Sequence, residues 1–382
     1  MILKKIALLV LLFMSVCSYA QYDSIPYNSY DRTYLVHLPT GYTGTTNLPL
    51  IIAMHGGFGN ASKMETLSQL SLKADIENFI VVYPEGVEGG ILNNRTWNAG
   101  WCCGFSSNNN IDDVGFIDSL LTTLINQYSI DTNRIYATGI SNGGFMSYRL
   151  ACELSNKISA IAPVASSMSM TSCSPSRPVP IIHFHSSLDS NVPYIGGVGS
   201  GVSNHYNSPI DSILNVWSNK NTCLNINDTI INNTQYTLTK WSNCSCSTEI
   251  HYYLTEDGGH SWPGGIANPI GDPVSTYINA NDLMWTFFQQ YSLNCSPLSV
   301  PNDFFEESII SIYPNPTDKY LKIQTEIEYH KLKISIYSIL GEQLLKVENQ
   351  TKIDISHLPI GAYFILINID GNIKAKKILK IE

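Results

Sequence analysis

Hydrophobic positions in the first three quarters of the chain follow two different periods. Short continuous apolar runs, such as 48–54 and 134–140, predict buried strands. Between such runs, segments such as 65–79 and 111–128 place apolar residues three and four positions apart, which predicts helices. Strands that alternate with helices favour crossover units on a largely parallel sheet. The pattern therefore predicts an α/β fold with helices on both faces of the sheet.

The pattern changes after Cys295. Residues 296–309 contain prolines and show no helical period, so they are predicted to be a linker. From 310 to 382, apolar and polar residues alternate with a period of two, and glycines stand at the breaks. This alternation predicts a small antiparallel β-sandwich. We therefore expect an α/β domain over 21–295 and an all-β domain over 310–382.

The first twenty residues have the layout of an export signal. A lysine pair, an apolar stretch over 6–16 and a small-x-small site precede Gln21. The apolar stretch is too short to span a bilayer. Lipid attachment at Cys17 is an alternative, disfavoured by the bulky Val16 before it. We predict that 1–20 is a signal peptide and that the protein is secreted, extracellular or attached to the cell surface, without a stable membrane span.

Charge and cysteine content narrow the function classes. The net charge is −9 and no basic stripe stands out, which argues against nucleic acid as a partner. Eight cysteines follow the predicted cleavage site, and an even number in an exported protein favours disulfides. The pairs at 102–103 and 244/246 lack the spacing of common zinc knuckles, so no metal is expected.

Disulfide connectivity cannot be deduced from the sequence alone. Adjacent Cys102 and Cys103 are expected to bond different partners, because a bond between neighbours is strained. The trial pairings are Cys152 with Cys173, and Cys223 with Cys244 or Cys246.

The strongest chemical motif is G-x-S-x-G, with Ser141 at its centre. It follows a predicted strand and opens a predicted helix, in "YATGISNGGFMSYRLACEL". Such a turn needs glycines at its flanks and lifts the serine hydroxyl above the sheet. The alternative is an ordinary turn, but the strand-to-helix context favours a nucleophile.

A serine nucleophile needs a base, and the base needs an acid. His260 lies in a glycine-rich loop directly after the last predicted strand, whereas His183 and His185 lie inside an apolar strand and are expected to be structural. Asp189 follows that strand and precedes His260, in the chain order Ser, Asp, His. Asp257 is the alternative acid, but only two residues separate it from the histidine. We predict the triad Ser141, Asp189 and His260.

Oxyanion stabilisation requires two amide donors near the nucleophile. The amide of Asn142 follows the serine, and the glycine-rich "HGGFG" segment follows an early strand. Gly57 is the predicted second donor, with Phe58 as the alternative. His55 is expected to organise this loop.

Aromatic residues cluster near the predicted catalytic loops. Trp262 is two residues beyond the predicted base, and Phe58 and Trp101 lie in neighbouring loops. Aromatic walls suit a flat or apolar acyl group or a sugar ring. We predict that Phe58, Trp101 and Trp262 contact the substrate, with core packing as the alternative for Trp101.

Five motifs in order carry a family resemblance. The segment 25–293 resembles the secreted polyhydroxybutyrate depolymerase and feruloyl esterase group of α/β-hydrolases, related to carbohydrate esterase family one. The resemblance implies an α/β-hydrolase fold, a serine esterase with the triad named above, and no metal or organic cofactor. One departure is Ser186, where such proteins usually have glycine. The motifs are "WNAGWCCG", "IDDVGFIDSLL", "RIYATGISNGGFMSYRLACEL", "HFHSSLDSNVPY" and "GGHSWPGG".

The tail carries a second resemblance. "SIYPNPT", "ISIYSILGEQL" and "IDISHLPIGAYFILI" resemble the C-terminal sorting domain of the type IX secretion system. This implies that the secretion machinery is a partner. A carbohydrate-binding module is the alternative, disfavoured because the tail has no tryptophan for stacking on sugars.

The expected substrate is a carboxylic ester, either a feruloyl or acetyl ester of plant polysaccharide or a polyhydroxybutyrate-type polyester. The sequence does not decide between them, since they share the triad and differ in pocket shape. A serine peptidase of the same fold and a non-catalytic surface-binding protein are the alternatives.

Overall fold

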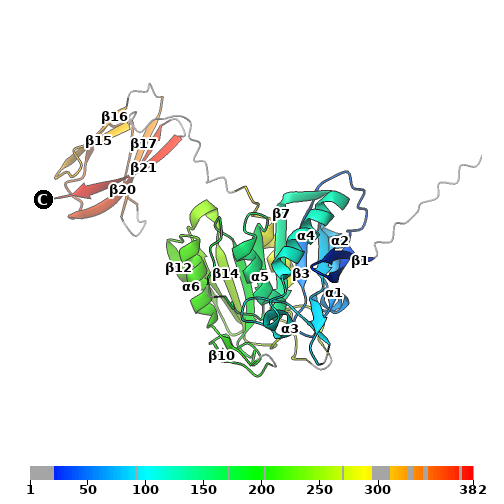
Figure 1. Ribbon diagram of the computed structural model, residues 1–382. Coiled ribbons are helices and arrows are strands. Elements are labelled where there is room, and N and C mark those ends of the chain that lie inside the picture. The colour runs from blue at the N-terminus through cyan, green and yellow to red at the C-terminus, as the bar shows by residue number, and fades with distance from the viewer. Residues whose placement is uncertain are drawn as a thin grey trace, which may run out of the picture. The chain divides into compact units, whose positions relative to one another are not determined.

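The computed structural model of the chain divides into two compact units, Met1–Leu298 and Ser299–Glu382, and each is described by itself (Figure 1). The structure describes residues 21–91, 93–170, 172–201, 204–268, 271–294, 310–325, 330–338, 343–369 and 372–381. The predicted signal peptide and linker lie outside these residues.

A ten-stranded sheet forms the centre of the first unit. Its six middle strands, from β4 to β14, are parallel, and the outer strands pair antiparallel at both edges. In spatial order the strands are β1 (Gln21–Tyr27), β2 (Tyr30–His37), β4 (Ile80–Pro84), β3 (Leu48–Met54), β7 (Ile130–Ile140), β8 (Ala160–Val164), β9 (Ile181–Ser186), β14 (Ile250–Thr255), β13 (Tyr236–Ser242) and β12 (Asn225–Asn232).

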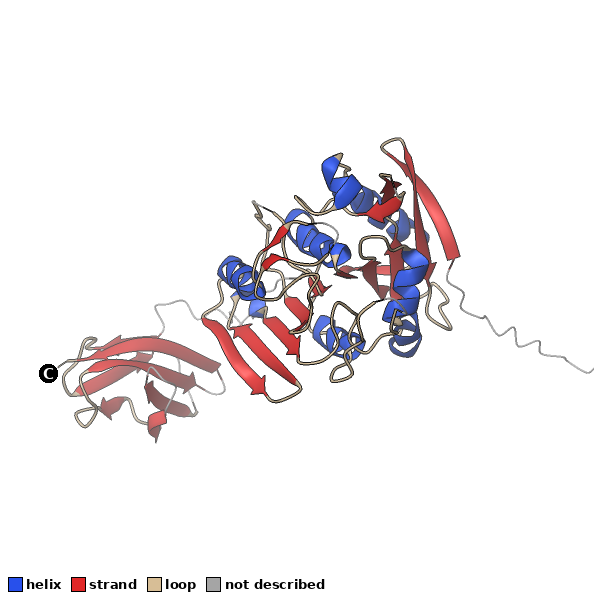
Figure 2. Ribbon diagram, turned by 90° about the horizontal axis from the view of Figure 1, so that it is seen from below, coloured by secondary structure: helices blue, strands red, loops and turns tan. Residues whose placement is uncertain are grey.

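Helices cover both faces of this sheet, as Figure 2 shows. Strand β3 explains why, because all seven of its residues are buried and their side chains alternate between two cores. Leu50 and Ile52 belong to one core, and Ile51 and Ala53 to the other. The first core includes α4 (Asp113–Gln127), α5 (Asn142–Glu153) and α6 (Ile210–Lys220), and the second includes α1 (Ala61–Ser68), α2 (Leu70–Glu77) and α7 (Ala280–Phe288).

The predicted α/β class is confirmed, with differences in detail. The helical pattern over 65–79 belongs to two helices, α1 and α2, because Gln69 between them has φ 58° in the left-handed region. Short elements lie in the connections of the sheet. They are β5 (Val87–Gly89), β6 (Asn94–Thr96), α3 (Gly104–Asn108), β10 (Gly197–Val198), β11 (Tyr206–Asn207) and the 3₁₀ turn Ser245–Ser247.

The second unit consists of two antiparallel sheets around one apolar core, so the predicted β-sandwich is confirmed. Leu321 from one sheet and Ile334 and Ile365 from the other are fully buried in this core. One sheet contains β15 (Ile310–Tyr313), β16 (Tyr320–Thr325) and β19 (Lys352–Asp354); the other contains β18 (Gln343–Glu348), β17 (Leu332–Ser338), β20 (Gly361–Ile369) and β21 (Asn372–Lys380).

No helix within the described part of the chain is long and apolar enough to cross a membrane.

Candidate active site

Ser141 stands on a sharp turn between β7 and α5, with φ 55° and ψ −125°. Packing explains the glycines around it. A Cβ atom at Gly143 would lie 2.2 Å from the Met54 carbonyl oxygen, and one at Gly139 would lie 2.5 Å from the Gly143 carbonyl carbon. The Ser141 amide donates to Val164 O at 2.9 Å, which ties the turn to β8. Only glycine allows the strand and helix to approach closely enough for this turn.

His260 and Asp189 meet above the ends of β14 and β9. His260 Nδ1 lies 2.8 Å from Asp189 Oδ2, and the aspartate side chain is fully buried. The alternative acid, Asp257, instead accepts hydrogen bonds from Ser275 and Thr276. Because Asp189 accepts at Nδ1, Nε2 of the ring is available to a serine proton.

Two features hold this pair in place. Asp189 Oδ1 accepts the amides of Asn191 and Val192, each at 2.9 Å. Burial alone would raise the pKa of Asp189, but the hydrogen bonds from His260 and from the Val192 amide act in the opposite direction, so the pKa lies below its usual value. The His260 amide donates to Asp272 Oδ2 at 2.7 Å. Sequence reasoning missed Asp272, because it lies twelve residues beyond the histidine and belongs to no motif.

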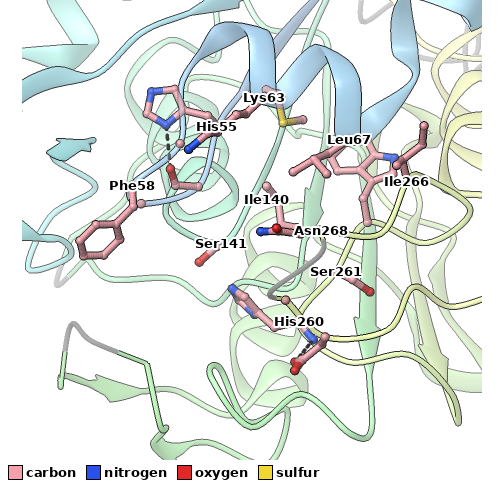
Figure 3. A pocket seen from close by; sticks show the side chains of 17 residues that line it. His55, Phe58, Lys63, Leu67, Ile140, Ser141, His260, Ser261, Ile266 and Asn268 are labelled. Carbon is pink, nitrogen blue, oxygen red and sulfur yellow. Dashed lines mark hydrogen bonds between the residues drawn. The ribbon is translucent and has the colours of Figure 1, made fainter.

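Ser141 and His260 line the same two cavities, so the two predicted catalytic side chains share one site. One cavity has a volume of about 300 Å³ and extends over α1 and the His260 loop (Figure 3). In Figure 3 the His260 ring lies beside the Ser141 side chain. The second cavity, of about 330 Å³, extends over the start of α5 and the Asp189 loop. A molecule bound at Ser141 thus has room for a substituent on either side.

The amides predicted to bind an oxyanion differ in whether they already have a partner. Asn142 is the first residue of α5, where an amide has no partner within the helix. Gly57 lines both cavities, whereas the Phe58 amide is already used, since it donates to Arg95 O at 3.0 Å. This arrangement favours Gly57 over Phe58 as the second donor.

Buried polar groups fix the loops that carry these amides. His55 Nε2 accepts the Gly86 amide at 3.0 Å, and its Nδ1 donates to Gly56 O at 2.7 Å. Burial lowers the pKa of His55 to about 4, so the ring is neutral at neutral pH. The Asn142 side chain makes two hydrogen bonds to the Trp97 backbone, at 2.6 and 3.0 Å.

The three predicted aromatic contacts have different surroundings. Phe58 is 46% exposed and lines both cavities. Trp262 lines the first cavity but is only 2% exposed, and its indole nitrogen donates to Asn281 Oδ1. Trp101 lines a separate cavity that contains neither Ser141 nor His260. The structure therefore brings Phe58 and Trp262 to the site and leaves Trp101 outside it.

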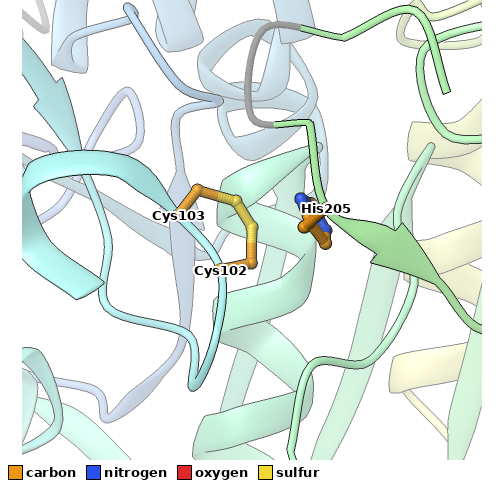
Figure 4. A group of neighbouring side chains, drawn as sticks. All are labelled: Cys102, Cys103 and His205. Atoms are coloured by element: carbon orange, nitrogen blue, oxygen red, sulfur yellow. A yellow bond between two sulfur atoms is a disulfide. The ribbon is translucent and has the colours of Figure 1, made fainter. Parts of the chain in front are cut away.

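Three disulfides are described in the structure. The prediction for Cys102 and Cys103 was wrong, because they bond to each other and not to different partners. Cys103 lines the second cavity, and His205 lies against the pair (Figure 4). These three side chains form a ligand-like cluster, but the bonded sulfurs are not thiolates and cannot serve as ordinary metal ligands.

The remaining pairs are Cys152–Cys173 and Cys223–Cys244, as in the trial pairings, and Cys246 is also disulfide-bonded.

Ser186, which departs from the family pattern, connects the acid and base loops. Its hydroxyl donates to Asp257 O at 2.9 Å and accepts the Leu188 amide at 3.1 Å. Glycine has no hydroxyl and could make neither contact. The substitution therefore adds a side-chain link between the two loops.

The first unit has an α/β-hydrolase fold, with a serine turn at the carboxyl end of the central parallel strand. The chain was also compared with protein families, and each of its two units matches one. Residues 32–176 match the family of esterase PHB depolymerases, and residues 311–381 match the secretion system C-terminal sorting domain. Both resemblances seen in the sequence are thereby confirmed. The sorting domain places the protein outside the cell or at its surface, as predicted.

Known relatives include several esterases. Feruloyl esterase B of Piromyces equi is 29% identical over 69% of this chain and 46% of its own length. A bifunctional acetylxylan esterase/xylanase of Neocallimastix patriciarum is 26% identical over 60% of this chain and 31% of its own. This chain thus spans less than half the length of these two relatives. Feruloyl esterase C of Emericella nidulans is 25% identical over 67% of this chain and 83% of its own length.

A solved structure shows the same fold. The acetyl xylan esterase from Aspergillus awamori aligns with a TM-score of 0.51 at 15% identity, over 71% of this chain and 99% of its own. This likeness concerns the fold of the first unit.

Proposed function

We propose that this protein is a secreted serine esterase that hydrolyses carboxylic esters through an acyl-enzyme, with Ser141, His260 and Asp189 as its catalytic triad. The observation that carries the proposal is the hydrogen bond from His260 Nδ1 to the buried Asp189, in a loop that lines the same cavities as Ser141. The family match and the esterase relatives support the same reaction class.

The geometry suggests how each group takes part. His260 Nε2 removes the Ser141 proton as the hydroxyl attacks the ester carbonyl, and buried Asp189 stabilises the imidazolium that forms. The amides of Gly57 and Asn142 donate to the oxyanion. His260 then gives its proton to the departing alcohol, and water repeats the sequence on the acyl-enzyme. No step requires a metal or an organic cofactor.

Replacing the nucleophile tests the proposal directly. Ser141→Ala should lower the hydrolysis of p-nitrophenyl acetate by at least about 10³-fold, because the acyl-enzyme can no longer form. Its thermal unfolding should remain close to that of the wild type. A fluorophosphonate probe should label the wild type at Ser141 and leave the variant unlabelled. Retained turnover in Ser141→Ala would contradict the assignment, and absence of labelling in the wild type would favour the non-catalytic alternative.

For the acyl group, we propose an ester of plant cell-wall polysaccharide, feruloyl or acetyl, in preference to a polyester. Support comes from the relatives named as feruloyl and acetylxylan esterases, and from cavities of about 300 and 330 Å³ with an exposed Phe58 between them. Full-length protein should release acid from methyl ferulate or acetylated xylan and leave a poly-3-hydroxybutyrate film intact. Clearing of the film without release of either acid would reverse the preference. Cleavage of a matched amide as fast as the ester would favour a peptidase.

We also propose that the C-terminal domain interacts with the type IX secretion machinery. The match of residues 311–381 to the sorting domain supports this partner. Deletion of these residues should retain the esterase inside a type IX-competent host, as measured by immunoblotting of the medium and cell fractions.

A further inference from the structure

A continuous chain of buried polar side chains runs from α5 through β9 to the predicted catalytic acid. Tyr148 comes from α5, and His183 and His185 come from β9. The Tyr148 hydroxyl lies 2.9 Å from His183 Nδ1, and His183 Nε2 lies 3.1 Å from His185 Nδ1. His185 Nε2 lies 2.7 Å from Val192 O and 3.4 Å from Asp189 Oδ2. None of the three side chains lines either cavity at Ser141.

The direction of this chain is fixed by its end at Val192. A carbonyl oxygen can only accept, so His185 must carry its proton on Nε2. Its Nδ1 is then an acceptor, which requires a proton on His183 Nε2. His183 Nδ1 is in turn an acceptor, and the Tyr148 hydroxyl donates to it. Burial lowers the pKa of both histidines, so both rings are neutral and each carries one proton.

Val192 connects this chain to the catalytic acid. Its carbonyl accepts from His185, while its amide donates to Asp189 Oδ1 at 2.9 Å. With the opposite tautomer, an unprotonated His185 Nε2 would face both the Val192 carbonyl and the Asp189 carboxylate. The lone pair of Nε2 would then face the lone pairs of both oxygens in a buried site, and the repulsion would push the loop that carries Asp189 away.

We propose that Tyr148, His183 and His185 form a hydrogen-bonded chain of fixed direction that positions Asp189 against His260. The inference rests on the proposed serine esterase function and extends it to residues that touch neither the substrate nor the reacting atoms. All three are positioning residues. A buried histidine pair that only filled space would not need one tautomer, and this difference makes the proposal testable.

The tautomers can be observed directly. In the full-length protein labelled with ¹⁵N-histidine, the ¹⁵N spectrum should show His183 and His185 as neutral rings protonated on Nε2. The His185→Asn and Tyr148→Phe variants assign the signals. A proton on Nδ1 of His185 would overturn the proposal, and this readout does not depend on any enzymatic activity.

A matched pair of substitutions tests the effect on catalysis. The side-chain amide nitrogen of His185→Gln can occupy the position of Nε2 and still donate to Val192 O, whereas that of His185→Asn is too short to reach it. With p-nitrophenyl acetate, kcat should fall about ten-fold in His185→Asn, because the Val192 carbonyl beside Asp189 is left buried without its donor. In His185→Gln, kcat should stay within about three-fold of the wild type. KM should change little in both variants, because His185 lines neither cavity at Ser141.

Equal losses of kcat in the two variants, or no loss in His185→Asn, would overturn the proposal. If His185→Asn does not fold, Tyr148→Phe provides the test, since it removes one hydroxyl and keeps the ring. Its kcat should fall about three-fold with unchanged KM, the effect of one neutral hydrogen bond. An unchanged kcat in Tyr148→Phe would refute a chain that extends beyond His185. If the wild type hydrolyses no ester, the proposed function fails while the tautomer measurement still stands.

Discussion

Ser141 depends on neighbours that have no side chains. Its φ of 55° is unusual for a residue other than glycine, and the structure holds it there through a close approach of α5 to β3. The nearest contacts of a Cβ atom added at Gly139 or Gly143 are backbone atoms, which cannot move aside as a flexible side chain could. The backbone geometry of the turn is therefore a condition for the chemistry, because the hydroxyl becomes a candidate nucleophile only after the turn is formed.

Gly143→Ala should therefore destabilise the turn. The added methyl group would lie 2.2 Å from Met54 O and 2.6 Å from His55 O, so the helix start must shift. We expect a loss of about 1–3 kcal/mol in the free energy of unfolding by urea. Gly57→Ala is the matched control for stability, since nothing lies within 4 Å of its added Cβ atom. Similar losses in both variants would show that packing does not explain the requirement at Gly143.

The neutral ring of His55 predicts a pH dependence of stability. Burial lowers its pKa from 6.5 to about 4, so the unfolded chain binds the proton more readily. The stabilisation from burying the neutral His55 ring is complete above about pH 7. As the pH falls from about 6.5 towards 4, the free energy of unfolding decreases by up to about 3 kcal/mol. Urea unfolding near pH 7.5 and pH 4.5 should show this loss in the wild type and a smaller one in His55→Gln. If the stability of the two proteins depended on pH in the same way, His55 would not be its source.

At the scale of elements, α5 carries the nucleophile at one end and a disulfide at the other. Cys152 lies in the last turn of the helix and bonds Cys173, which follows β8 in the chain. The Ser141 amide is bonded to β8 at the opposite end of the helix. One end of the helix is thus tied to β8, and the other end is tied to the segment that follows β8.

Removing this disulfide should lower the stability of the protein more than its kcat. The bond spans a sequence separation of 21 residues, for which chain entropy predicts a contribution of about 3 kcal/mol. The double variant Cys152→Ser/Cys173→Ser should lose about this amount in urea unfolding, while kcat of the folded fraction changes little. A fall in kcat without a change in stability would place the disulfide in the chemistry instead.

At the scale of the whole molecule, the two units have separate cores. The buried residues of the first unit form two clusters on the faces of its sheet, and those of the second form a third cluster of their own. The predicted triad and both cavities belong entirely to the first unit. We therefore expect the proposed catalytic and sorting functions to be separable.

A protein that ends at Leu298, the boundary of the first unit, should keep its full activity. Its kcat on p-nitrophenyl acetate should equal that of the full-length protein, and its thermal midpoint should agree within about 2 °C, because no part of its core is removed. A lower midpoint or a lower kcat would show that the second unit supports the first.

Much of the site could be predicted because its signals are local. The turn at Ser141 needs glycines at fixed offsets, and His260 follows a strand in a glycine-rich loop. Asp189 followed from chain order, and its choice over Asp257 agrees with the contacts of both residues. Asp272 and Tyr148 left no such signal, since a single aspartate or tyrosine is common in any loop or helix. Their roles arise only from contacts with distant residues.

The sequence by itself determined the class of fold, the division into an α/β and an all-β part and the proposed triad, because these depend on periodicity and on backbone geometry at short range. Tertiary structure alone decided that Cys102 bonds Cys103, that Trp101 lies apart from Ser141, and that the Phe58 amide is occupied. It alone also aligned His183 and His185 with Tyr148. Such pairings depend on how separate segments pack, and no local pattern records which buried donor meets which acceptor.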